Sequence, residues 1–136
     1  ELGMSGFRIR KLADTELVSY GSQSDLRVFI GDEQRSTPVR VALQTCQPGY
    51  DVPSHCHPYI EYLIVVEGAA EFRIESDGIQ TVELRQGDVV ELHPGVWHAF
   101  TTTPECVTRL LGIHISDERI VNYREGVKTD ARGFRV

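Results

Sequence analysis

Two histidines, a glutamate and two glycines stand at fixed spacing in the segment Gly49-x5-His55-x-His57-x3-Glu61-x6-Gly68. A third histidine, His98, follows thirty-seven residues after Glu61. Imidazole nitrogens and carboxylate oxygens are common ligands of divalent transition metals in proteins. The pattern predicts that His55, His57, Glu61 and His98 hold one metal ion, so the chain must fold in a way that brings these four side chains together.

The alternating side-chain directions of a β-strand extend this site. If the segment around His57 is extended, residues two apart share one face. That face carries, in order, His55, His57, Tyr59, Glu61, Leu63 and Val65. An acid on a face that becomes apolar indicates a partly buried site, because an isolated buried carboxylate costs several kcal/mol unless a partner compensates it. Cys56 should face the other way, as a small buried residue and not a ligand.

Short β-branched and aromatic runs, separated by Gly, Pro and Asp turn signals, continue from Leu26 to the C-terminus. Such spacing is typical of an all-β barrel or sandwich. Asp77-Gly78 predicts a two-residue hairpin turn. Helical periodicity is weak, and Arg10–Ser19 is expected to hold a turn or two of helix at most. We expect strands at Leu26–Ile30, Val39–Thr45, His57–Glu67, Ala69–Glu75, Ile79–Leu84, Asp88–Leu92, His98–Thr102 and Val107–Ile115.

Length and charge restrict the class of protein. A chain of 136 residues is expected to form one domain, residues 1–136, because two separate cores would each lie near the lower limit for stable folding. The net charge of −6 argues against a nucleic-acid partner, which would need a basic face. The longest apolar run, Leu63–Val66, is too short to span a bilayer, so no membrane partner is expected.

The first residues and the cysteines bear on the compartment. No basic segment followed by an apolar one opens the chain, which predicts that it carries no signal peptide. Met4 is the only methionine, so residues 1–3 are expected to be left over from cloning. Three cysteines without a CxxC pair imply no disulfide framework, and a reduced, cytoplasmic protein is expected.

The segment from Val39 to Ile115 resembles a single-domain cupin. The histidine–glutamate segment matches the first cupin motif at every spacing, and Gly87, Gly95 and His98 match the second, written G-x5-P-x-G-x2-H-x3-N. Two positions depart from it, since His93 stands where proline is expected and Thr102 replaces the asparagine. Neither departure falls on a ligand, but the turn into His98 is expected to be built differently. The eighteen residues between the motifs, 69–86, are similar in length to those of small microbial members.

The resemblance implies a fold, a metal and its ligands. The fold would be all-β, a single double-stranded β-helix or jelly-roll barrel whose core spans residues 39–115. The ligands would be His55, His57, Glu61 and His98, holding one divalent transition metal ion. Three imidazoles and a carboxylate suit Fe, Mn, Ni, Co, Cu or Zn better than Mg or Ca. Four protein ligands on an octahedral metal would leave two positions open for substrate, water or O2.

Tyr59 and His114 are further candidates, each with two interpretations. Tyr59 shares the face of the ligands, and it is either a hydrogen-bond donor and acid in the pocket or an aromatic wall residue. His114 is either a proton shuttle that faces the lumen, or a histidine without such a role that lies at the surface or is hydrogen-bonded by its neighbours. Both are predicted as catalytic candidates together with Glu61.

Positions along the other predicted strands are less informative. Arg40 and Gln44 alternate with Val39, Val41 and Leu43, so one of the two sets should line the lumen. Phe100 is expected to wall the pocket beneath the metal. Trp97 is expected outside the barrel or against a partner subunit, and His93 in solvent.

Two classes of function fit these residues. The first is a metal-dependent enzyme acting on a small organic molecule, with a dioxygenase favoured over an isomerase or lyase. In the isomerase or lyase version Glu61 would act as base, and Tyr59 or His114 would supply the acid. The alternative is a non-catalytic cupin that binds or senses a small ligand. The resemblance also suggests a homodimer, with terminal strands adding to the neighbour's sheet.

Overall fold

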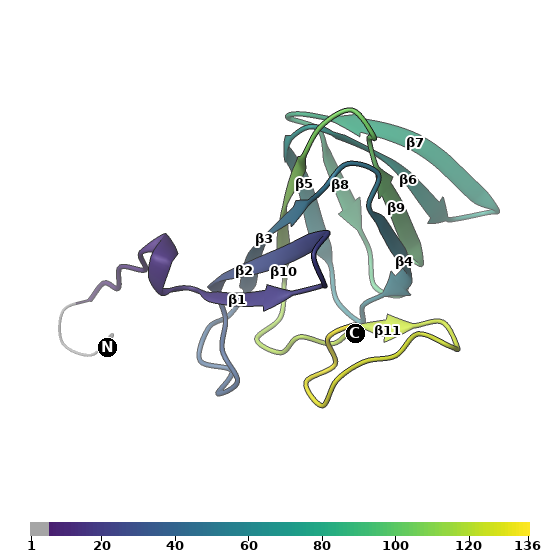
Figure 1. The fold of residues 1–136 in the computed structure, drawn as a ribbon. Helices are drawn as coiled ribbons and strands as arrows, with labels where there is room; N and C mark the ends of the chain where they lie inside the picture. Colours follow the sequence, from purple (N-terminus) through teal and green to yellow (C-terminus); the bar gives the residue numbers. More distant parts are fainter. Residues whose placement is uncertain (1–5) are drawn as a thin grey trace.

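The computed structural model describes residues 6–136 as two antiparallel sheets that close into a barrel (Figure 1). One sheet has six strands in the order β1-β2-β3-β10-β5-β8, and the other has five in the order β11-β4-β9-β6-β7. This arrangement confirms the all-β, jelly-roll prediction. The strands are β1 (Glu16–Ser19), β2 (Ser24–Ile30), β3 (Arg40–Cys46), β4 (Asp51–Cys56), β5 (Glu61–Glu67), β6 (Ala69–Glu75), β7 (Ile79–Arg85), β8 (Val89–Leu92), β9 (His98–Thr102), β10 (Thr108–His114) and β11 (Asn122–Tyr123).

Both sheets contribute to one apolar core. Its fully buried centre pairs Val65 and Leu110 from the six-stranded sheet with Phe72 from the other. Phe72 packs on Phe100 with ring centroids 4.9 Å apart. Phe100 therefore belongs to this core and is not among the residues that line the cavity beside His55, His57 and Glu61, contrary to the prediction that it walls the pocket.

The predicted strand His57–Glu67 is wrong at its start. β4 ends at Cys56, residues 57–60 form a bend, and β5 begins at Glu61. Pro58 lacks an N–H to continue a ladder, and the chain crosses here from the five-stranded to the six-stranded sheet. His55 and Glu61 therefore come from different sheets, although they were predicted to share one strand.

Other boundaries differ in smaller ways. Leu12–Asp14 forms a single 3-10 turn, in line with the turn or two expected within Arg10–Ser19, and Glu16–Ser19 is strand β1. The hairpin after β6 is present, but Glu75 pairs with Ile79, which leaves three residues in the turn and not two. Asp77 and Gly78 both take positive φ there, as the sequence predicts for this turn.

Gly68 allows a close approach between β5 and its neighbours. Its φ is +84°, and a Cβ at this position would lie 2.8 Å from the carbonyl oxygen of Val107. Only glycine both adopts this positive φ readily and has no Cβ to clash, which explains why glycine stands at position 68 of the first motif.

The C-terminal residues 119–136 run beneath the barrel, with β11 paired to β4 at the edge of the five-stranded sheet (Figure 1). Within residues 6–136 there is no helix with the length and apolar character needed to cross a bilayer. The expectation that residues 1–3 remain from cloning lies outside the described residues.

Candidate metal centre

Four side chains from three strands and one bend converge at one end of the barrel. His55 lies in β4, His57 follows it directly, and Glu61 and His98 are the first residues of β5 and β9. His55 and His98 are cross-strand partners in the pairing of β4 with β9. The candidate ligand atoms of the four residues all lie within 4.8 Å of one another.

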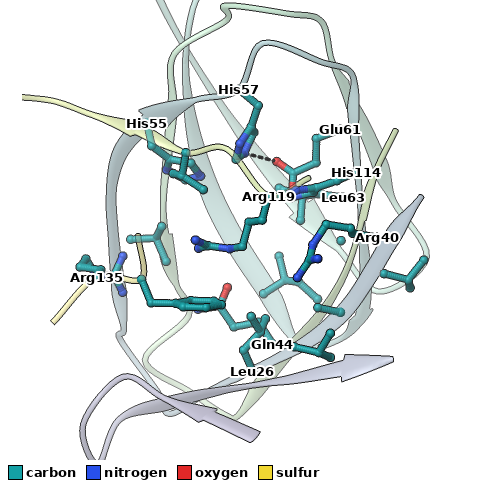
Figure 2. Close-up of a pocket in the computed structure, with 18 of the residues that line it drawn as sticks. Leu26, Arg40, Gln44, His55, His57, Glu61, Leu63, His114, Arg119 and Arg135 are labelled. Carbon is teal, nitrogen blue, oxygen red and sulfur yellow. Dashed lines mark hydrogen bonds and ion pairs between the residues drawn. The ribbon is translucent and has the colours of Figure 1, made fainter. Parts of the chain in front are cut away.

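The centre of this cluster is buried, and it brings two imidazole nitrogens close to one carboxylate oxygen. His57, Glu61 and His98 are 4%, 5% and 1% exposed. Nε2 of His57 lies 3.1 Å from Oε1 of Glu61 (Figure 2). Nε2 of His98 lies 3.4 Å from the same oxygen. These three atoms are buried and have no hydrogen-bond partner among residues 6–136. Buried polar atoms are rarely left unsatisfied, and a cation at their meeting point would satisfy all three.

Backbone carbonyls fix which nitrogen of each imidazole faces the centre. Nδ1 of His55 lies 2.8 Å from the carbonyl oxygen of Pro53, and Nδ1 of His98 lies 2.9 Å from that of Val96. Nδ1 of His57 lies 2.8 Å from the carbonyl oxygen of Ile120. A carbonyl only accepts, so each Nδ1 donates its hydrogen, and in the neutral ring Nε2 then carries the lone pair. Three lone pairs therefore face the cluster, as metal ligands require.

Proline in β4 explains part of this geometry. The register between β4 and β9 shifts by one residue between Val52 and His55, around Pro53, which has no N–H for the ladder. The carbonyl of Pro53 is then the acceptor for His55, two residues later. His98 uses the same relationship with Val96, also two residues earlier. These acceptors were missed in the sequence, where an i−2 carbonyl leaves no residue-type signal.

The protonation states also suit a metal. Burial lowers the pKa of His55 from an ordinary 6.5 to about 3, so this ring is neutral at physiological pH. Burial alone would raise the pKa of Glu61, but the charge and hydrogen bond of His114 and the contacts with His57 and His98 hold it well below its usual 4.5. The site therefore presents a neutral His55 ring and an ionised Glu61 carboxylate.

Glu61, His114 and Tyr59 form a hydrogen-bonded chain. Nε2 of His114 lies 2.9 Å from Oε2 of Glu61, and Nδ1 of His114 lies 2.6 Å from the Tyr59 hydroxyl. Burial lowers the pKa of His114 and raises that of Tyr59 to about 12, so both are neutral near pH 7. His114 then donates from Nε2 to Glu61, and Tyr59 donates to Nδ1 of His114. The backbone N–H of Ile120 donates to the Tyr59 oxygen across 3.1 Å.

Of these two candidates, His114 lines the cavity beside the cluster and Tyr59 does not. The Tyr59 ring stacks on His57 with centroids 5.2 Å apart, behind the ligand cluster. Tyr59 can therefore reach a substrate only through His114. Of the two sets of residues on β3, Arg40 and Gln44 line the cavity, together with Ala42 and Val41.

The remaining candidates lie away from the cluster. Cys56 is buried, burial raises its thiol pKa, and it is not part of the ligand group. His93 is exposed and pairs with Glu91. Trp97 is half-buried, and the Arg124 guanidinium lies 3.7 Å from its ring centroid.

The cavity beside the cluster is completed by residues that the sequence did not single out. Arg119, Val121, Phe134 and Arg135 line it from the C-terminal segment, and Tyr20 lines it from the turn after β1. This segment has no strand-like alternation that would have assigned it to the barrel.

Comparison with known proteins gives a family and several similar folds. The model of the family described as Cupin domain matches residues 42–114. Acireductone dioxygenase of Phaeosphaeria nodorum is 29% identical over 83 residues, which cover 60% of this chain and 47% of that protein. The chain thus spans about half the length of the curated relative that it matches.

The solved structures that are similar in fold include the following three. Bacillus subtilis oxalate decarboxylase, studied for its Mn(II) centres, has a TM-score of 0.72 at 19% identity, covering 82% of this chain and 30% of that one. An oxalate oxidase has a TM-score of 0.71 at 17% identity, covering 90% and 67%. Peruvianin-I, a cysteine peptidase from Thevetia peruviana latex, has a TM-score of 0.71 at 12% identity, covering 85% and 76%. Because these three differ in named activity, the shared fold does not define a reaction.

Proposed function

The chain belongs to the cupin domain family, and from that premise we propose that it is a metal-dependent enzyme acting on a small organic molecule. His55, His57, Glu61 and His98 would hold one divalent transition metal ion. The observation that carries this proposal is the convergence of three buried, unpartnered ligand atoms: Nε2 of His57, Oε1 of Glu61 and Nε2 of His98. A bound metal would supply a Lewis acid and, for a redox-active ion, a path for electrons to O2.

Among the reactions open to such a site, we favour a dioxygenase over an isomerase or lyase. The similarity to an acireductone dioxygenase supports this preference, since it is a match in sequence and not only in fold. The likeness to an oxalate oxidase and an oxalate decarboxylase supports metal chemistry on a small molecule without choosing between the classes.

Residues of this chain would position the substrate and would donate or accept protons. Glu61 divides its two oxygens, because Oε1 faces the imidazole cluster and Oε2 accepts from His114. His114 lines the cavity and would exchange a proton with a substrate there. Tyr59, whose hydroxyl contacts Nδ1 of His114, would position that ring and replace a proton it gives up.

The first test is the bound metal. Elemental analysis of the purified chain beside His57→Ala should give near one equivalent of a transition metal in the parent, and a loss of that metal in the variant. Exposed His93→Ala is the matched control, and it should retain the metal. Absence of metal, with no uptake on reconstitution of a folded chain, would reject the proposal.

The second test separates an enzyme from a sensor. The metal-loaded chain is screened for O2 consumption and product formation with catechols and 2-oxo acids. An enzyme should turn over at least one substrate, and His114→Gln should lower that rate without removing the metal. A chain whose melting temperature rises with these compounds, but which converts none of them, would be a ligand-binding cupin.

The proposal also covers assembly, location and domain extent. We propose a homodimer, since Ile9, Leu12 and Leu17 are 70%, 60% and 51% exposed and residues 6–14 extend away from the barrel (Figure 1). Light scattering that returns a monomer mass would reject this assembly. We also propose that residues 1–136 act as one cupin domain in the cytoplasm.

A further inference from the structure

Three arginine side chains line the same cavity as the proposed metal ligands. Arg40 comes from β3, Arg119 follows β10, and Arg135 lies in the C-terminal segment. All three are half-buried. Figure 2 shows the Arg119 side chain in the middle of the cavity, between His55 and Arg40, with His57 and Glu61 at one end.

None of these three guanidinium groups forms an ion pair with a carboxylate of residues 6–136. Their hydrogen-bond acceptors are neutral: Arg40 donates to the carbonyl oxygen of Asp32 across 3.2 Å, and Arg119 to that of Gly133 across 3.2 Å. Arg135 donates to the Tyr50 hydroxyl. Ion pairs form instead at arginines outside the cavity, namely Arg35, Arg73, Arg85, Arg109, Arg124 and Arg132.

The charge balance of the cavity is therefore opposite to that of the chain. Its lining holds these three cations and one carboxylate, Glu61, which faces the imidazole cluster and His114. The whole chain carries a net charge of −6. Like charges gathered in a partly enclosed space repel one another, and an anion bound between them removes that repulsion.

The size and walls of the cavity limit what the anion can be. The volume is about 100 Å³. Since one water occupies roughly 30 Å³ in the liquid, the cavity takes a molecule the size of about three or four waters. Leu26, Val28, Leu63 and Leu110 give it apolar walls. A short aliphatic chain fits these walls better than a second charged group.

From these observations we propose that the substrate is a small organic acid whose carboxylate is bound by Arg119 and Arg40. Its other oxygen atoms face His55, His57 and Glu61, so this assignment of substrate class rests on the proposed function. Planar guanidinium groups donate in pairs to carboxylate oxygens, and such charge-assisted bonds are about twice as strong as neutral ones. Arg135 adds positive charge from the C-terminal segment.

The test uses pyruvate and its neutral isostere, pyruvamide, as probes in isothermal titration calorimetry. The full chain is titrated both metal-loaded and after chelation, and metal content is measured in the same samples. Pyruvate should bind at least tenfold more tightly than pyruvamide in both forms. Equal affinity for the two probes, or tighter binding of inorganic phosphate than of pyruvate, would overturn the proposal.

Arginine variants assign the effect to the cavity. Arg119→Gln and Arg40→Gln should each weaken pyruvate binding about tenfold or more and leave pyruvamide binding unchanged. Arg85→Gln removes the same charge from the exposed strand β7 and should change neither. Unchanged pyruvate affinity in both cavity variants contradicts the inference.

Two controls keep the result interpretable. Arg119 also contacts Gly133 and Phe134, so Arg119→Lys, which keeps the charge, should recover part of the affinity, and melting temperatures show whether each variant is folded. Failure of the metal site would appear as missing metal with the pyruvate preference intact in the chelated chain. Failure of the present inference would appear as bound metal without that preference.

Discussion

His114 lies opposite Glu61 in the pairing of β5 with β10, and its Nε2 is 2.9 Å from Oε2 of Glu61. This cross-strand contact holds one carboxylate oxygen, so the other, Oε1, faces Nε2 of His57 and of His98. The orientation of the proposed ligand thus depends on a residue that does not itself belong to the ligand group. Residues that orient metal ligands are often nearly as important for affinity as the ligands.

Replacing His114 by leucine should weaken metal binding. The variant removes the donor to Oε2, so Glu61 is no longer fixed, and losses of about 10–100-fold are typical for such partners. A chelator competition titration measures the metal Kd. His114→Gln, whose amide N–H can still donate to Glu61, should retain part of the affinity. Exposed His93→Leu should leave the Kd unchanged, and equal Kd values for His114→Leu and the parent would contradict the orienting role.

A methyl group at Gly112 should disturb the same carboxylate from another side. Gly112 lies in β10 without a positive φ, and an added Cβ would lie 3.2 Å from Oε2 of Glu61 and 3.5 Å from Cδ2 of Leu63. The backbone tolerates alanine, but the carboxylate must shift by a few tenths of an ångström. We expect Gly112→Ala to raise the metal Kd about tenfold or less, with a stability change within about 1 kcal/mol.

Calorimetry and chelator competition on the same preparation check both parts of the Gly112 prediction. A variant that melts like the parent but binds metal more weakly supports the steric argument. Parent-like metal affinity in a folded variant would show that Glu61 does not need the space beside Gly112.

The metal-free chain should lose stability on the acid side of neutrality. His55 has a folded pKa of about 3 against an ordinary 6.5, so between these values the unfolded chain binds a proton that the folded chain does not. Stability therefore falls as pH decreases through this window, by an amount on the order of 3–5 kcal/mol for a site this buried. His114, whose pKa is also lowered, adds to the loss in the same direction.

Glu61 titrates in a lower window. Its folded pKa is depressed, so its contribution is present above about pH 4.5 and is lost as pH falls further through the folded value. Urea denaturation of the chelated chain at pH 7.5 to 4.5 isolates the histidine part. His55→Asn should flatten the slope in this range. Parallel curves for parent and variant would mean that His55 does not drive the acid loss.

The cluster of His55, His57, Glu61 and His98 could be predicted from sequence because its residue types are specific and three of its four members stand within seven residues. The strands that bring these residues together could not be predicted in the same way. Strand alternation placed His55 and Glu61 on one strand, whereas the break at Pro58 puts them in two sheets that face one cavity. Because the chain bends between two strand ends, the side chains still point to a common centre.

The features of the site that could not be predicted from sequence share one physical reason. The acceptors of His55 and His98 are backbone carbonyls, which every residue carries, so no residue type marks Pro53 or Val96. Arg119 and Arg135 reach the cavity because residues 119–136 fold back under the barrel. That return depends on contacts between residues far apart in sequence, which periodicity does not reveal.

Phe134 should fix this C-terminal segment in place. It is only 3% exposed although it is the third residue from the end. The Arg119 guanidinium lies 3.9 Å from the centroid of the Phe134 ring. The backbone N–H of Phe134 donates to Oδ1 of Asp130 across 3.0 Å. Phe134→Ala should therefore cost on the order of 3 kcal/mol, since a buried aromatic ring is removed and a gap is left beneath Arg119.

Limited proteolysis with trypsin, together with the melting temperature, checks the Phe134 prediction. Cleavage after Arg124 and Lys128 should become faster in Phe134→Ala, because the segment detaches more often from the barrel. Val136→Ala, at a residue that is 78% exposed, is the matched control and should behave like the parent. If Phe134→Ala also behaved like the parent, ring burial would not be what holds residues 119–136 beneath the cavity. The position of Arg119 would then have to depend on its bond to Gly133 instead.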